Sequence, residues 1–408
     1  MIEPDGRPIL AGLKVVELSA FVAAPLGGAT LASLGAEVVR VDPPGGGIDA
    51  NRWPLHNGKS LYWAGLNQGK RSVTIDTRAE EGQRLVTRLI VEAGIVLTNL
   101  PTRGWNSYER LVQDRPDLIM AILTGNPDGT AAVDYTVNAA MGFPFVTGPE
   151  GWEGPVNHVL PAWDALTGYL IATGLLAAEL HRTRTGEGQL LTLSLADVAL
   201  AVSGHLGMIG EAQLNETPRG RFGNDLYGTY SRDFRTADGK YVIVVALTSR
   251  QWESILDATG LSSELRALEA SRHADFRLEG DRFESRHEIS QLLSSWIEAR
   301  PYLEVQEAFD RHRVLWGPYQ TFKELASVDP RCSVKNPLFA ELDQPGIGTY
   351  LRAGSPLVFS GASRVPPKRS PSMGEDTDAV LRDWLGLDEK ELQTLSRTGL
   401  TAPGAGKP

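Results

Sequence analysis

Short apolar runs alternate with helical patterns through the first 125 residues, and this alternation constrains the fold more than any other feature of the chain. Near-continuous apolar runs rich in β-branched residues predict buried strands at Lys14–Leu18, Glu37–Asp42, Ser72–Asp76, Ile95–Leu100 and Leu118–Gly125. Helical patterns separate these runs at Leu26–Leu34, Glu80–Glu92 and Ser107–Val112. Buried strands with helices between them predict an α/β fold, in which a parallel sheet is covered by helices on both faces.

The alternation is interrupted once and then resumes. The stretch Asn126–Pro161 is rich in Gly, Pro, Asp and Asn and has little periodicity, so it predicts a surface excursion or an active-site loop. A helix rich in small residues is then expected from about Asp164 to Arg182, followed by a strand at Gln189–Ser194 and a helix from about Ala196 to Glu211. These elements continue the large domain.

From about Thr217 the chain changes character. The basic, glycine-rich segment Arg219–Asn224 predicts a hinge before a smaller α/β domain that ends near Val328. The elements expected in that domain are a strand at Lys240–Leu247 and helices near Arg250–Ala258, His287–Ala299 and Tyr302–Asp310. Further elements are expected after it: a turn before a strand at Gln344–Tyr350, a final helix around Asp376–Leu385 and a disordered tail from about Thr401.

Composition excludes several classes of function. A net charge of −10 argues against general binding of nucleic acid, which needs many Lys and Arg contacts to phosphate. No apolar run approaches the about 20 residues that span a bilayer, and the N-terminus lacks the features of a signal peptide. The single cysteine, Cys332, excludes an intrachain disulfide and a cysteine-rich metal site. We therefore expect a cytoplasmic protein with no membrane and no nucleic-acid partner.

The loop after the first predicted strand, Ser19–Pro25, falls where ligands gather in parallel α/β sheets, at the carboxyl ends of the strands. It carries no G-x-G-x-x-G fingerprint and the chain has no Walker-type lysine, so NAD and ATP are disfavoured. The seven histidines form no H-x-x-x-H or H-E-x-x-H pair, so no metal is expected. Basic residues that could meet a small anion, or be solvated surface charges, are Arg40, Lys70, Arg71 and Arg103.

Asp164 stands at the head of the helix that is rich in small residues. The positive end of the helix dipole and unpaired backbone N–H groups there would favour an ionised carboxylate, as a nucleophile requires. An ordinary helix cap explains an aspartate at this position equally simply, and from the residues alone it is the commoner case. His158, in the preceding loop, is likewise either structural or catalytic.

An ordered set of motifs resembles the family III CoA-transferases, the formyl-CoA transferase and carnitine CoA-transferase type. The matching segments are Leu10–Leu18 with Ala24-Pro25, Leu34–Asp42, Asn67–Ser72, Asp164 ahead of Gly168–Gln189, Asp238–Leu247 and Met373–Thr377. Together they cover essentially residues 8–390. The resemblance implies that Asp164 is the catalytic nucleophile, which favours catalysis over the simple cap.

The resemblance also implies an architecture and further site residues. It implies an open Rossmann-like large domain built from residues 1–216 and 331–408, a small domain at 217–330, and two chains interlocked as a homodimer. No cofactor is implied beyond the CoA of the substrate. The residues implied to lie along CoA are Phe21, Val22, Ala23, Arg40, Lys70, Arg71, Asn99 and Leu100. His158 or Asn157 is expected to orient a substrate carboxylate or stabilise an oxyanion.

Departures from the family pattern narrow the chemistry. The post-strand arginine of oxalate-using members is replaced by Pro43, and their glycine-rich lid is not evident after Asn224. The related racemases carry a histidine before an aspartate, where this chain has Val133 before Asp134, so racemisation is disfavoured. An intermolecular transferase with a donor such as succinyl-CoA, and a CoA-binding protein without catalysis, remain alternatives.

Several unusual strings resemble one branch of the family, which transfers CoA between the C1 and C4 carboxyls of 2-methylfumaryl-CoA (mesaconyl-CoA). These strings are Ser19–Gly28, Arg52–Pro54, Tyr62–Leu66, Asp134–Asn138, Val156–Asp164, Gly204–Ile209 and Gln344–Gly348. The resemblance implies an intramolecular transfer through an aspartyl anhydride and an aspartyl-CoA thioester.

Overall fold

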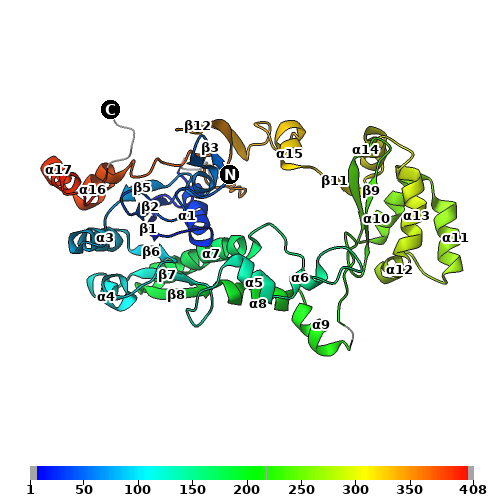
Figure 1. The fold of residues 1–408 in the computed structure, drawn as a ribbon, viewed down its shortest axis with the longest axis horizontal. Coiled ribbons are helices and arrows are strands. Elements are labelled where there is room, and N and C mark those ends of the chain that lie inside the picture. The colour runs from blue at the N-terminus through cyan, green and yellow to red at the C-terminus, as the bar shows by residue number, and fades with distance from the viewer. Residues whose placement is uncertain (1–6, 217, 403–408) are drawn as a thin grey trace. The chain divides into compact units, whose positions relative to one another are not determined.

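The computed structural model describes residues 7–216 and 218–402, which fall into two compact units (Figure 1). The large unit draws on Met1–Met141, Val159–Gly210 and Pro330–Pro408, and the small unit on Gly142–His158 and Glu211–Asp329. The small unit thus includes residues 142–158, which the division at residue 217 had left in the large domain. Each unit is described separately below.

A six-stranded parallel sheet forms the centre of the large unit, with strand order β5-β2-β1-β6-β7-β8 (Figure 1). Its strands are β1 (Lys14–Leu18), β2 (Glu37–Asp42), β5 (Arg71–Thr74), β6 (Ile95–Thr98), β7 (Ile119–Thr124) and β8 (Gln189–Ser194). All five pairings between neighbours are parallel. The mixed α/β class predicted from the alternating pattern is confirmed.

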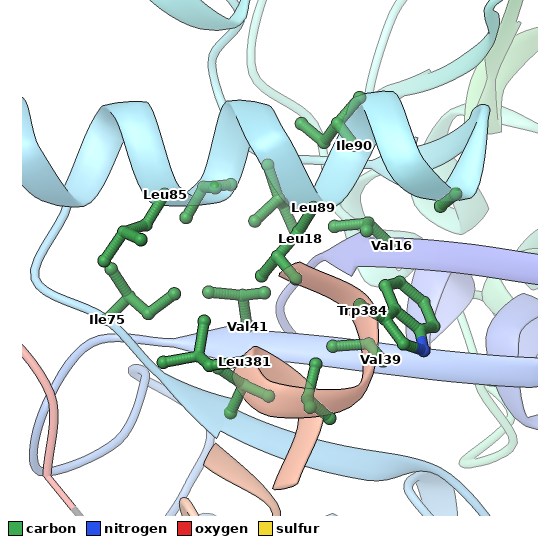
Figure 2. Packing of buried hydrophobic residues seen from close by; sticks show 14 of the residues in the cluster. Val16, Leu18, Val39, Val41, Ile75, Leu85, Leu89, Ile90, Leu381 and Trp384 are labelled. Carbon is green, nitrogen blue, oxygen red and sulfur yellow. The ribbon is translucent and has the colours of Figure 1, made fainter. Parts of the chain in front are cut away.

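One face of this sheet is covered by α3 (Glu80–Ala93) and α16 (Thr377–Leu385). Leu85, Leu89 and Ile90 of α3 lie over Val16 and neighbouring sheet residues, and Leu381 and Trp384 of α16 complete the same cluster (Figure 2). Because α16 comes from the end of the chain, the C-terminal segment contributes directly to the core that the first strands form. Burial of this apolar surface is the main source of the unit's stability.

The other face carries α1 (Ala23–Ser33) and α7 (Ala162–Thr185), which pack closely on each other through glycines. A Cβ atom at Gly27 would lie 2.6 Å from Cγ2 of Ile171, and one at Gly168 would lie 2.9 Å from the carbonyl oxygen of Ala23. α1 follows β1 directly, and the contact of Gly168 with Ala23 places the start of α7 beside the start of α1. Both helices therefore begin near the carboxyl edge of the sheet.

Shorter elements complete the large unit. They are β3 (Leu55–His56), β4 (Lys59–Ser60), α2 (Leu61–Leu66), the 3-10 helix η1 (Gly104–Asn106), α4 (Tyr108–Asp114), α5 (Asp134–Ala140), α8 (Leu195–His205), the hairpin β12 (Phe339–Gln344) and β13 (Gly348–Ala353), and α17 (Glu389–Arg397). The helix α9 (Met208–Leu214) crosses the boundary between the two units.

Some local predictions were wrong, for physical reasons. The predicted loop at 126–161 contains α5 and the four-residue α6 (Phe143–Val146), which are too short to show helical periodicity. The single helix predicted at 196–211 is broken at Gly207, whose φ of 78° a helix cannot accommodate. The tail was expected to be disordered from Thr401, but Thr401 is buried and pairs with Ile75; residues 403–408 lie outside the described residues.

The small unit is built around a three-stranded antiparallel sheet, of which only the central strand was predicted. Its strands, in spatial order, are β11 (Leu315–Pro318), β10 (Tyr241–Ala246) and β9 (Tyr230–Arg235). Its helices, besides α6, are α10 (Ser249–Thr259), α11 (Ser262–Ser271), α12 (Glu279–Glu284), α13 (Arg286–Ile297), α14 (Tyr302–His312) and α15 (Phe322–Val328). The sheet, α10, α13 and α14 share an apolar core that includes Tyr230, Trp252 and Phe309.

The packing of α1 on α7 generates a prediction. Replacing Gly168 with alanine places a methyl group against the backbone of Ala23, so we expect Gly168→Ala to lower the free energy of unfolding by about 1–3 kcal/mol. Gly65→Ala is the matched control, since Gly65 lies in α2 and a Cβ there meets no atom within 4 Å. Urea denaturation of both variants measures the effect, and equal stability of the two would contradict it.

Candidate active site

A cavity of about 770 Å³ opens at the carboxyl edge of the large unit's sheet, where the ends of β1, β6 and β7 meet the first turns of α1 and α7. This is the edge at which parallel α/β sheets bind ligands, and the volume suits part of a large cofactor with its substrate group. The residues that line it are Phe21–Ala23, Arg52, Tyr62, Asn99–Thr102, Ile122–Gly125, Gly129–Tyr135, Pro161, Asp164 and Leu195. Six of the residues named from the sequence are among them: Phe21, Val22, Ala23, Asn99, Leu100 and Asp164.

Asp164 lies in the first turn of α7, half-buried, with its side chain in the wall of the cavity. Burial, and after it the nearby carboxylate of Asp134, raise the pKa of its carboxyl to about 6. The positive charge of Arg52 acts in the opposite direction. At neutral pH the group is therefore mostly ionised, yet its charge is poorly solvated, a combination suited to a carboxylate nucleophile.

Asp134, which the sequence did not single out as a site residue, caps the helix that carries Asp164. Its side chain is 1% exposed, and its Oδ2 accepts hydrogen bonds from the backbone N–H groups of Trp163, at 2.7 Å, and Asp164, at 3.0 Å. The expectation that such N–H groups face the side chain of Asp164 was wrong, since they donate to Asp134. The helix end is neutralised by Asp134, so Asp164 gains a repulsive neighbour and is not its own cap.

The loop after β1 is held in a fixed conformation by two side chains from other parts of the unit. Asn99 accepts from the N–H of Ala20 at 2.9 Å and donates to its carbonyl oxygen at 2.8 Å. The N–H of Phe21 donates to Asp49 Oδ2 at 3.1 Å, and Phe21 has a φ of 65°, which is uncommon for a bulky residue. These contacts turn Phe21, Val22 and the start of α1 toward the cavity.

Arg52 and Tyr62 line the cavity beside Asp164 and were also missed as individual residues. The guanidinium carbon of Arg52 lies 5.2 Å from the ring centroids of both Phe21 and Tyr62. Burial is the main reason that the pKa of Tyr62 rises to about 12, so its phenol stays protonated and can donate a hydrogen bond. The sequence signal for both residues lies in the strings Arg52–Pro54 and Tyr62–Leu66, which carry part of the family resemblance.

Arg40, expected beside CoA, lies within a buried network. It is 1% exposed, and its guanidinium donates to Asp42 at 2.9 and 3.0 Å, to Asp49 at 2.9 Å and to Asn67 at 3.1 Å. Each of its three nitrogens therefore already has a partner within the unit. Since Asp49 also holds the N–H of Phe21, we propose that Arg40 positions the loop after β1 in place of the predicted contact with CoA.

Lys70 is similarly enclosed. Its Nζ donates to Glu17 Oε1 at 2.7 Å, to the carbonyl oxygen of Pro25 at 2.8 Å and to Asn67 Oδ1 at 2.9 Å, and its side chain is fully buried. Burial lowers its pKa to about 8, against the opposing charge of Glu17. These contacts tie β1, α1 and the segment before β5 together, so we propose a positioning role for Lys70 as well.

Arg71, the remaining basic residue predicted to contact CoA, pairs with carboxylates on the face of the sheet covered by α16. It contacts Glu37 at 2.6 Å and Asp383 at 3.0 Å, and it does not line the cavity. The partners of Arg71 differ from those of Lys70, which are Glu17, Pro25 and Asn67. The geometry favours a structural role for Arg71.

Asn157 and His158 belong to the small unit. His158 has a buried Nδ1 without a hydrogen-bond partner in the part of the chain that the structure describes. The proposed roles of both residues stay predictions.

Among residues 7–216 and 218–402, no group of three or more His, Cys, Asp and Glu side chains is placed to hold a metal ion. No helix in the same residues has the length and apolar composition to cross a membrane.

Comparison with known proteins places the cavity in a family context. The family model described as CoA-transferase family III matches residues 10–377. The chain is 54% identical to 2-methylfumaryl-CoA isomerase of Chloroflexus aurantiacus over 97% of this chain and 98% of that one. It is 30% identical to succinyl-CoA–D-citramalate CoA-transferase of the same organism, over 95% and 97% of the two chains. A CAIB/BAIF family protein from Brucella suis has a similar structure, with a TM-score of 0.76 and 27% identity over 93% of this chain and 100% of that one.

The environment of Asp164 predicts a pH-dependent cost to stability. A carboxyl pKa raised from 3.8 to about 6 costs at most about 3 kcal/mol at neutral pH, so we expect Asp164→Asn to stabilise the protein by about 1–3 kcal/mol at pH 7.5. The carboxyl of Asp164 binds its proton more tightly in the folded state than in the unfolded state. The stability gained by Asp164→Asn should therefore shrink as pH falls through 6 and vanish near pH 4. Urea denaturation at several pH values measures it; a gain independent of pH would contradict the account.

Proposed function

The chain belongs to CoA-transferase family III, and on that premise we propose that it transfers CoA between the C1 and C4 carboxyls of 2-methylfumaryl-CoA. It is an enzyme, as its membership and its 54% identity to an isomerase of this substrate indicate. Two observations together carry the proposal: this identity of 54%, and a half-buried aspartate, Asp164, in the wall of a cavity of about 770 Å³.

The first half of the proposed reaction moves CoA from the substrate to the enzyme. A carboxylate oxygen of Asp164 attacks the C1 thioester carbonyl, the carbon–sulfur bond breaks, and CoA leaves as a thiolate, so that a mixed anhydride remains. The thiolate then attacks the aspartyl carbonyl of the anhydride. The bond from that carbonyl to the bridging oxygen breaks, which gives an aspartyl-CoA thioester and free 2-methylfumarate (mesaconate) with both carboxylates ionised.

The second half repeats these steps with the other carboxylate. Mesaconate turns within the cavity, and its C4 carboxylate attacks the aspartyl thioester and expels the thiolate. The thiolate attacks the C4 carbonyl of the new anhydride, which releases Asp164 as a carboxylate and gives the C4 thioester. No proton is gained or lost overall. Retention of mesaconate in the cavity gives it a high effective concentration against carboxylates in solution.

The electrostatics of the cavity support Asp164 in this role. As an ion it is opposed by burial and by Asp134, but as an anhydride or thioester it carries no charge. Acylation therefore removes an unfavourable charge, which lowers the energy of the covalent intermediates relative to the free enzyme. The protonated phenol of Tyr62 can donate to an oxygen that becomes negative during attack.

CoA is proposed to lie along Phe21, Val22, Ala23, Asn99 and Leu100. These residues line the same cavity as Asp164, and the first turn of α1 has no side-chain cap on its backbone N–H groups.

A cytoplasmic location of the protein remains a prediction.

We further propose that two copies of the chain form the interlocked homodimer implied by the family resemblance. Leu166, Tyr169, Leu170 and Leu180 of α7 are 42–52% exposed and share one face of that helix. Several exposed large apolar side chains on one face are typical of a surface that another chain covers. Light scattering on the purified protein measures the mass, and a monomer at micromolar concentration would contradict the proposal.

The proposed nucleophile predicts a dependence of turnover on pH and on Asp164. We expect Asp164→Asn to lower kcat by at least about a thousandfold, because no other group at this position can form the anhydride. In the wild type kcat/KM should fall with the ionised fraction of Asp164 as pH drops below about 6. Substantial turnover of the variant, or a flat profile between pH 5 and 8, would exclude this role.

Intramolecular transfer is distinguished from an ordinary two-substrate transferase by isotope exchange. The 30% identity to a succinyl-CoA-dependent transferase makes that alternative worth testing. When 2-methylfumaryl-CoA turns over in the presence of excess labelled mesaconate, we expect little label in the product thioester, because the bound diacid is recaptured before it leaves. Label that enters the product as fast as isomer forms would favour intermolecular transfer.

A further inference from the structure

Arg52 is the cationic side chain of the cavity. Among the described residues that line it, no other Arg, Lys or His is present. Arg52 is exposed to the cavity, and among the described residues no carboxylate or carbonyl group forms a hydrogen bond with its guanidinium. Arg40, by contrast, has each of its guanidinium nitrogens bound to protein groups. The cavity thus contains a cation whose donors are available to a ligand.

The position of Arg52 is fixed by aromatic rings. Its guanidinium carbon lies 5.2 Å from the ring centroid of Phe21 and 5.2 Å from that of Tyr62. Such contacts stabilise a cation through the faces of the rings and supply no conventional hydrogen-bond acceptor. Phe21 is itself fixed by the hydrogen bond from its N–H to Asp49. The charge is therefore held in place while its N–H donors are left for a planar, bidentate acceptor such as a carboxylate.

The charge of Arg52 acts at the reacting end of the substrate. It lowers the pKa of Asp164 and that of Tyr62, so it lies within effective electrostatic range of the nucleophile. In an acyl-CoA the phosphates are separated from the thioester by the whole pantetheine arm. A cation this close to the group that attacks the thioester faces the acyl portion and not the phosphates.

We propose that Arg52 binds the carboxylate of the acyl group that is not joined to CoA, and so selects dicarboxylic acyl-CoA thioesters. The inference rests on the proposed function, and it adds how the diacid is recognised and retained. With 2-methylfumaryl-CoA the bound carboxylate is C4 before transfer and C1 after it. Once CoA has moved to Asp164, the ion pair with Arg52 keeps the free diacid in the cavity while it turns.

The test compares two thioesters that differ in the second carboxylate: 2-methylfumaryl-CoA and methacryloyl-CoA, which has the same skeleton without C4. Calorimetry in the Asp164→Asn background gives dissociation constants without turnover. We expect Arg52→Gln to weaken binding of the dicarboxylic thioester about 10- to 100-fold. The dissociation constants of methacryloyl-CoA and free CoA should stay within about twofold of their values without this substitution. Arg52→Lys should weaken binding of the dicarboxylic thioester less than Arg52→Gln does. Arg84→Gln is the control, since Arg84 is an exposed arginine on α3, and it should change none of the three dissociation constants.

Two outcomes of the binding measurements would overturn the inference. Equal weakening of both thioesters and of free CoA would assign Arg52 to the phosphates of CoA, and unchanged binding of all three would leave Arg52 without a role in recognition. Isomerisation of 2-methylfumaryl-CoA by the wild type is measured separately. If it is absent while the preference for the second carboxylate depends on Arg52, the proposed function fails and the inference stands.

Discussion

The site depends on the close packing of α1 on α7. Glycines at the crossing let the two backbones approach until Gly168 lies against the carbonyl of Ala23, and this brings the first turns of both helices to one edge of the sheet. The loop after β1 and the carboxylate of Asp164 then face the same cavity, although more than a hundred residues separate them. A larger side chain at the crossing would separate the two halves of the site.

Charged side chains near the sheet are of two kinds: those enclosed by partners within the protein, and those that face the cavity. Arg40 and Lys70 are buried, and each is surrounded by oxygen acceptors, so they fix the loops that shape the cavity. Asp164 and Arg52 face the cavity with fewer protein contacts and are available for chemistry and binding. Asp134 has both a structural and an electrostatic effect, because it caps α7 and at the same time makes the ionised state of Asp164 less favourable. The positioning of the helix and the reactivity of its aspartate thus have a common cause.

The sequence was most informative where a residue's neighbours are set by the periodic pattern. It predicted β1 and β2 with their observed bounds, the parallel sheet, and the placement of the loop that contains Phe21 at the carboxyl edge. It could not tell a basic residue that faces a ligand from one enclosed by the protein, since that depends on contacts such as Arg40 with Asp49, which only the fold brings together. The cap from Asp134 was missed for the same reason, because thirty residues of irregular pattern separate it from Asp164. Family resemblance supplied the proposed role of Asp164, which its position at a helix end alone left open.

Mass spectrometry can detect the covalent link between Asp164 and CoA that the proposed reaction requires. The protein is mixed with 2-methylfumaryl-CoA, quenched with hydroxylamine during turnover and digested. We expect a hydroxamate on the peptide that contains Asp164, formed from the aspartyl thioester or anhydride, and none in the Asp164→Asn variant. An unmodified Asp164 peptide during full turnover, or a hydroxamate on another residue, would contradict it.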